Sequence, residues 1–162
     1  MDSDLLELPY KGNDLSLIVV LPRERNGLQK LKSIINYKIL NNAIKHLKSE
    51  RVDVHLPKFK VEQKYELKSA LSKNVILKMF TNEADFSGIN GKTNLMVSSI
   101  LHKVIIEVNE RGSEAAAATG IEISLTSESM NPTVFNADHP FLYLIRDKRN
   151  DVILFVGQIN RL

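Results

Sequence analysis

The chain has no cysteine and no tryptophan, and only five prolines and seven glycines among its 162 residues. Without cysteine it can form neither a disulfide nor a thiolate metal site. Its histidines, His46, His55, His102 and His139, are not spaced as in the HExxH zinc motif. No apolar run approaches the roughly 20 residues of a membrane-spanning helix. The sequence therefore predicts no disulfide framework, no metal or cofactor and no membrane partner.

Signatures of catalysis are missing too. The sequence contains neither the GxSxG elbow that presents a nucleophilic serine nor a glycine-rich phosphate loop of the GxxxxGK[ST] or GxGxxG type. Asp138 and His139 are adjacent, so we expect their side chains to diverge and not to form a relay. We therefore expect no catalytic residues and no enzyme.

The charge is mildly basic, with a net charge of +3 and a pI of about 9.1. The lysines are spread out and alternate with glutamates and apolar residues, without interleaved aromatics, as in Lys58, Lys60, Lys64, Lys68 and Lys73. This pattern favours a solvated face over a nucleic-acid stripe. A composition of 43% hydrophobic and 25% charged residues is that of a soluble globular protein.

Hydrophobic periodicity predicts a β-rich chain with a few helices. Leu15 to Leu21 is a continuous apolar run, which suits a strand buried on both faces. Apolar residues from Leu28 to Leu47 recur at helical spacing, with a break near Asn36 or at Asn41-Asn42. Three shorter segments follow: strands over residues 52–56 and 59–62, and an amphipathic helix from Tyr65 to Lys73.

The most informative stretch follows a predicted strand over residues 98–108. It reads Glu110, Arg111, Gly112, Ser113, Glu114, Ala115, Ala116, Ala117, Ala118, Thr119 and Gly120. One interpretation is a single helical turn, capped by Ser113 and ended by Gly120. The other is an exposed segment that can become a strand, since alanine loses almost no side-chain entropy on burial and fits any gap. Residues 121–134 carry no helical stripe, which favours the second interpretation.

An apolar strand begins in residues 135–145. The alanine-rich stretch resembles the hinge of the serpin reactive loop, and residues 135–145 resemble the serpin C-terminal signature. Residues 151–159 resemble the last buried strand of the family. Residues 6–10, 54–59 and 84–89 resemble serpin segments in the same order. The resemblance implies an α+β fold with mixed and antiparallel sheets. It also implies that residues 1–162 are a partial serpin domain, less than half of a serpin, with the reactive-loop region at 110–134.

The resemblance implies inhibition of serine proteases. The protease attacks the loop as a substrate and becomes acylated, and the loop then inserts into the central sheet as a new strand. Inserting about ten residues at roughly 1 kcal/mol per hydrogen bond gives on the order of 10 kcal/mol. The hinge suits insertion: Gly112 permits the bend, Ser113 is small, and Ala115 to Ala118 add no bulk. Glu114 would face solvent after insertion.

Two counts place the scissile bond. Counting from Glu110 by family spacing gives Thr126-Ser127, whereas counting back from Pro140 gives Ser129-Met130. No lysine or arginine lies between Gly112 and Ile145, and trypsin-like enzymes need a cation in their acidic pocket. We therefore expect a chymotrypsin- or elastase-like target, for which Leu125, Thr126 and Met130 are suitable.

The resemblance also implies a latch for the central sheet. His102 lies at the place of a buried serpin histidine, although a histidine that merely faces the core of its strand fits the sequence equally well. Glu110 and Lys58 match an ion pair at the top of the sheet, which, if exposed, contributes about 0 to 1 kcal/mol.

The missing N-terminal helices and sheet strands would leave one strand edge exposed, a site for self-association. We therefore expect this chain alone not to inhibit a protease. The missing part could reflect an incomplete gene sequence or a truncated product. We expect the parent protein to be secreted, although residues 1–4 lack the basic and apolar regions of a signal peptide. The alternative functions are a non-inhibitory serpin and an association fragment.

Overall fold

A computed structural model describes residues 1–74, 77–109 and 132–161 of the chain. The chain divides into two compact units. The first combines Met1–Lys58 with the segment from Val108 to the C-terminus, and the second is Phe59–Glu107. The hinge residues Glu110 to Thr119 and the scissile-bond candidates Leu125, Thr126, Ser127, Ser129 and Met130 lie outside the described residues.

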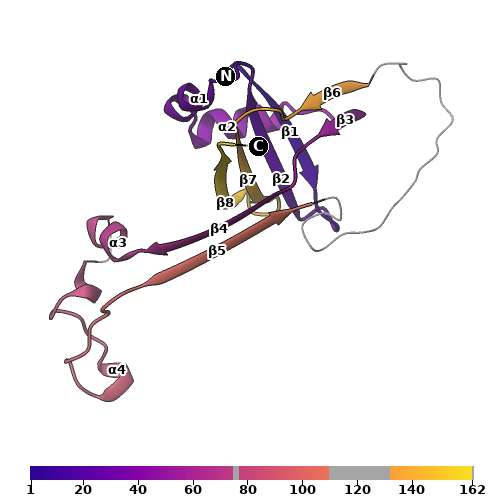
Figure 1. Cartoon of the computed structure of the whole chain (residues 1–162). Coiled ribbons are helices and arrows are strands. Elements are labelled where there is room, and N and C mark those ends of the chain that lie inside the picture. The colour runs from indigo at the N-terminus through magenta and orange to yellow at the C-terminus, as the bar shows by residue number, and fades with distance from the viewer. Residues whose placement is uncertain (75–76, 110–131, 162) are drawn as a thin grey trace. The chain divides into compact units, whose positions relative to one another are not determined.

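The first unit is built on a four-stranded antiparallel sheet (Figure 1). Its strands are β1 (Ser3–Pro9), β2 (Leu15–Pro22), β7 (Phe141–Asp147) and β8 (Val152–Ile159), in the order β1-β2-β7-β8. The turn between β1 and β2 carries Gly12 at φ +88° and Asn13 at φ 61°, left-handed conformations that glycine and asparagine tolerate. The sheet thus joins the two ends of the chain.

Strand β2 is the centre of the core, as its apolar run predicts. Its residues from Ser16 to Pro22 are all buried, because β2 has a strand on each side and side chains packed over it. Helices α1 (Leu28–Ile34) and α2 (Tyr37–Lys45) supply part of that cover. The shared core consists of Ile18, Val20, Leu28, Leu31, Leu40, Leu142 and Leu144.

The break in the helical segment lies at Asn36, the first of the two predicted positions. Asn36 is extended, and its side-chain Oδ1 accepts a hydrogen bond from the Ile39 amide at 3.0 Å. Asn36 is therefore the N-cap of α2, because its side chain pairs an amide of the first turn that has no partner within the helix. The pair Asn41-Asn42 lies inside α2.

A second, two-stranded sheet joins β3 (Val52–His55) and β6 (Thr133–Asn136) in parallel. The apolar segment over residues 135–145 is therefore two strands and not one: β6 ends at Asn136 and β7 begins at Phe141. Pro140, which lacks an amide donor, lies in the break.

The second unit is a pair of strands with short helices. Strands β4 (Phe59–Glu66) and β5 (Leu101–Val108) pair and run in opposite directions (Figure 1). They enclose α3 (Lys68–Asn74), the 3-10 turn η1 (Lys78–Phe80) and α4 (Ser87–Asn90) along the chain.

The helix predicted from Tyr65 begins instead at Lys68. Strand pairing continues past Tyr65, since the Leu67 amide donates to the Ile100 carbonyl at 2.9 Å. The Glu66 carboxylate then accepts a hydrogen bond from the Lys68 amide at 3.1 Å, at the start of α3. The prediction was therefore wrong about the start of the helix, because cross-strand pairing outweighs local helical spacing.

The last strand is present, but the prediction that it is buried is wrong for this chain. Val152, Leu154, Phe155 and Val156 on β8 are 39 to 68% exposed. The reason is position: β8 is the edge of its sheet, with β7 as its strand neighbour among the described residues. None of the helices in the described ranges is long and apolar enough to cross a membrane.

Candidate functional site

The strand before the predicted reactive loop has one charged face. Alternate residues of a strand share a face, and Lys103 and Glu107 of β5 meet two residues of β4 there. Lys60 Nζ lies 3.3 Å from the Glu107 carboxylate, and Lys103 Nζ lies 2.6 Å from Glu62. These side chains are about half exposed, so each pair contributes roughly 0 to 1 kcal/mol. They fix the alignment of β5 on β4.

The opposite face of β5 is apolar and carries His102. Val104 and Ile106 share that face by alternation, and Ile106 is buried. His102 itself is exposed, near the start of the strand. Lys58, also exposed, precedes β4, and Glu110 lies outside the described residues. The latch roles of these three residues therefore stay predictions.

The two edges of strand β5 differ in whether a neighbouring strand pairs with them. Within the part of the chain that the structure describes, β4 is its strand neighbour, and the sheet ends at β5 on the other side. The outer edge of β5 therefore presents backbone groups to which an added strand could bind.

The strand after the loop is held at both its backbone and its side chains. Each residue of β6 is in register with one of β3, from Val52 opposite Thr133 to His55 opposite Asn136. The Ala137 amide extends this pairing by donating to the His55 carbonyl at 2.9 Å. Phe135 and Ala137 are buried. Residues 133–137, at the end of the predicted reactive-loop region and just after it, are thereby paired with β3.

Asp138 and His139 do not diverge, contrary to the sequence-based expectation. The His139 Nδ1 lies 2.7 Å from the Asp138 Oδ1. The chain bends at His139 instead of continuing as a strand, so neighbouring side chains are not forced to opposite sides. The hydrogen bond from His139 is the largest cause that holds the pKa of the Asp138 carboxyl below its ordinary value. The sequence carries no signal for this pair, because the bend at His139 is a feature of the fold.

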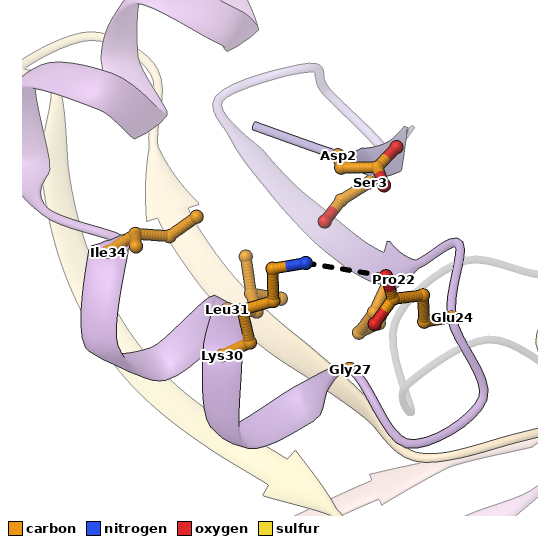
Figure 2. A pocket seen from close by; sticks show the side chains of 8 residues that line it. All are labelled: Asp2, Ser3, Pro22, Glu24, Gly27, Lys30, Leu31 and Ile34. Carbon is orange, nitrogen blue, oxygen red and sulfur yellow. Dashed lines mark hydrogen bonds and ion pairs between the residues drawn. The ribbon is translucent and has the colours of Figure 1, made fainter.

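A small pocket lies where β2 ends and α1 begins (Figure 2). Its lining residues are Asp2, Ser3, Pro22, Glu24, Gly27, Lys30, Leu31 and Ile34. Lys30 Nζ and Glu24 Oε1 form an exposed ion pair at 3.3 Å. The charged groups therefore satisfy one another, and the pocket offers a ligand no unpaired charge from this pair.

Comparison with known proteins decides the family. The family model described as Serpin (serine protease inhibitor) matches residues 1–162. The chain belongs to the serpin family. It is 45% identical to Iripin-8 of Ixodes ricinus over 167 residues and 41% identical to human Serpin B3 over 162 residues. Its fold is that of the C-terminal part of a serpin, α+β with mixed and antiparallel sheets.

A solved serpin structure supports the fold. Serpin48, described as a highly specific serpin in the insect Tenebrio molitor, matches 99% of this chain with a TM-score of 0.77 at 42% identity. The match covers 41% of the Serpin48 chain. The match to Iripin-8 covers 100% of this chain and 41% of Iripin-8. The match to Serpin B3 covers 99% of this chain and 42% of Serpin B3.

Proposed function

We propose that the protein from which this serpin chain derives inhibits serine proteases by reactive-loop insertion. The observation that carries the proposal is the hinge composition: from Gly112 to Thr119, every residue except Glu114 is small. Bulk or charge would oppose burial of alternate side chains in a sheet, and small residues do not. Family membership supports the same conclusion.

The inhibitor uses no catalytic groups of its own. The hydroxyl of the protease serine attacks the carbonyl of the scissile residue, the peptide nitrogen leaves with a proton, and an acyl-enzyme remains. Insertion of the freed hinge beside β5 then competes with hydrolysis of that ester. Roughly 10 kcal/mol from new backbone hydrogen bonds would suffice to distort the protease.

A hinge variant tests the mechanism in the full-length protein. Ala117→Pro removes an amide donor from the inserting segment and should convert the inhibitor to a substrate. The measurement is the protease complex that survives denaturing gel electrophoresis. The control is Gly88→Ala, at a position where an added Cβ meets no atom within 4 Å. Ala137→Pro cannot serve as a control, because the Ala137 amide donates a hydrogen bond to the His55 carbonyl. Equal complex formation by Ala117→Pro and wild type would refute loop insertion.

We further propose a chymotrypsin- or elastase-like target. The absence of lysine and arginine between Gly112 and Ile145 supports this choice, and Leu125, Thr126 and Met130 offer apolar or small contacts. Mass spectrometry of the digested protein should find chymotrypsin or elastase cuts within that window. Cleavage there by trypsin would contradict the proposal.

Two arginine variants locate the scissile bond. An arginine on the N-terminal side of the scissile bond should redirect inhibition to trypsin, because its cation fits the acidic pocket. If Thr126-Ser127 is cleaved, Thr126→Arg should form a stable trypsin complex, whereas the Ser129-Met130 bond requires Ser129→Arg. Whichever of the two variants does not form the trypsin complex is the matched control for the other.

For this chain alone we propose that it is cleaved without trapping the protease. It spans about 40% of its relatives, and within the described residues β5 has only β4 beside it. Insertion needs a strand on each side of the new one to satisfy both of its edges. A denaturation-resistant complex between this chain and chymotrypsin would overturn the proposal.

A non-inhibitory serpin is the alternative, and a rise in melting temperature after loop cleavage would exclude it. Self-association through exposed strand edges is a separate alternative for the isolated chain, which sedimentation velocity would detect as oligomers. We also propose that the parent protein is secreted; its recovery from culture medium would support this, and its retention in cells would contradict it.

A further inference from the structure

The bend between β6 and β7 is tied to a distant part of the chain through one histidine ring. The His139 side chain is 10% exposed, and both of its nitrogens have partners. Nε2 lies 2.6 Å from the carbonyl oxygen of Pro22, the last residue of β2, and Nδ1 lies 2.7 Å from the Asp138 carboxylate. The ring thus bridges the end of β2 and the segment that follows β6.

Both partners of the ring are hydrogen-bond acceptors. A carbonyl and an ionised carboxylate have no proton to donate, and a neutral imidazole has one N–H and one bare lone pair. A neutral ring would therefore satisfy one oxygen and turn a lone pair toward the other at less than 3 Å. A doubly protonated ring donates to both, and such charge-assisted bonds are the stronger kind. The geometry fits the imidazolium form.

The charged groups near the ring act in both directions: the Asp138 carboxylate favours a cationic ring, whereas the guanidinium groups of Arg25 and Arg23 oppose it. Asp138 carries its negative charge well below neutral pH, since the hydrogen bond from His139 and the nearby Arg25 lower its pKa. Arg25 donates to the Asp138 carboxylate at 3.1 Å and to its carbonyl at 3.2 Å. On the Pro22 side, Arg23 pairs with Asp2 at 3.7 Å and Asp4 at 3.1 Å, so its charge is offset.

The bridge is placed where it can position the reactive loop. Strand β6 has four residues and one strand neighbour among the described residues, β3, so its pairing alone is modest. Asp138 and His139 follow β6 by two and three residues. Their side chains therefore add hydrogen bonds from the segment after β6 to Arg25 and Pro22.

We propose that Arg25, Asp138 and His139 are positioning residues that fasten β6, and with it the C-terminal end of the reactive loop, to the end of β2 while His139 is doubly protonated. The part that concerns the loop rests on the proposed inhibitory function. Loss of one proton from the ring removes one of its two donated bonds.

The protonation state can be measured directly in the full-length protein. Nitrogen-15 spectra of the histidine rings distinguish the doubly protonated ring from each neutral tautomer. We expect the His139 spectrum at pH 6 to be that of the doubly protonated ring, because both of its nitrogens face acceptors. A single neutral tautomer of His139 at pH 6 would overturn the proposal without any variant.

Hydrogen exchange measures how firmly the segment after β6 is held. The reporter is the Ala137 amide, which is bonded to the His55 carbonyl at 2.9 Å. For His139→Gln we expect a protection factor at pH 6 lower than that of the wild type by about tenfold, the worth of one charge-assisted bond. Arg25→Gln should lower it by a smaller factor, and serves if His139→Gln does not fold.

The matched control is His46→Gln. His46 is exposed, and its Nδ1 lies 2.7 Å from the carbonyl of Asn42 in its own helix. Its replacement should leave the Ala137 protection factor unchanged. Unchanged protection in both His139→Gln and Arg25→Gln would overturn the proposal.

The effect on inhibition is read as the number of inhibitor molecules consumed per protease trapped. For His139→Gln this number should be higher than for the wild type, and for His46→Gln it should equal that of the wild type. If exchange at Ala137 changes while the number does not, the role in loop positioning is refuted. A full-length protein that traps no protease would refute the proposed function, while the ring spectra and exchange would still decide the anchor.

Discussion

Replacement of Gly157 by alanine should destabilise the C-terminal hairpin, because the glycine makes room for an aromatic ring. Gly157 on β8 is in direct register with Tyr143 on β7. A Cβ atom built at Gly157 would overlap the Cζ and Oη atoms of the Tyr143 ring. Tyr143 is 1% exposed and belongs to the largest fully buried side chains, so the ring has little space into which to move.

The magnitude follows from the overlap. Overpacking of a buried contact costs about 1 to 3 kcal/mol. Alanine would recover about 0.4 to 1 kcal/mol by restricting the unfolded chain, but only where the native site accepts it without strain. We therefore expect Gly157→Ala to lower the free energy of unfolding by about 1 to 3 kcal/mol. For a chain of this size each kcal/mol lowers the melting temperature by about 2 to 4 °C.

Urea unfolding of the wild type and variants is the assay. The control is Gly88→Ala in α4, where an added Cβ meets no atom within 4 Å, and its effect should stay within about 0.5 kcal/mol. Tyr143→Leu removes the distal ring atoms, so adding Gly157→Ala to it should cost much less than in the wild type. The steric argument is refuted if Gly157→Ala is neutral, or if it costs the same with and without the ring.

Two further predictions concern buried polar groups. The pKa of Asp147 is lowered from 3.8 to about 2, first by the hydrogen bonds from the Arg149 side chain and further by the Arg149 amide. Because the folded pKa lies below the unfolded value, this carboxylate stabilises the fold above pH 4 and loses that effect as the pH falls toward 2. Arg149→Met should raise the pKa of Asp147 part of the way to 3.8, measured by carboxyl NMR titration, and an unchanged pKa would contradict the assignment. Ser16 is fully buried, and its hydroxyl has no hydrogen-bond partner among the described residues. Ser16→Ala should therefore be neutral or raise the unfolding free energy by up to about 1 kcal/mol, and a clear loss in urea titration would be evidence against an unpaired hydroxyl.

Local patterns predicted the elements that depend on nearby residues. The apolar run over residues 15–21 predicted a fully buried strand, and Asn36 was one of two predicted helix breaks. Both signals are local: an uninterrupted apolar segment needs cover on both faces, and a side-chain oxygen three residues before an amide can cap it. The segment order of the family was likewise readable, since its motifs lie along the whole chain.

Predictions failed where partners come from elsewhere in the chain. The helix expected from Tyr65 lost its first turn to pairing with the region of Ile100. The apolar residues of β8 suggested burial, but their exposure depends on what lies beside the sheet edge. Periodicity records which residues can be buried, and not which neighbours are present to cover them.

The sequence alone indicated the family, the order of its motifs along the chain and the small residues of the predicted hinge, because these are properties of residue types at fixed spacings. The tertiary structure alone decided that His139 meets Pro22, 117 residues away, and that Asp138 turns to the same ring. A pair of adjacent polar residues does not reveal its partners, since a chain bend and a distant carbonyl determine them. The partners of one imidazole are therefore a property of the fold and not of the motif that contains it.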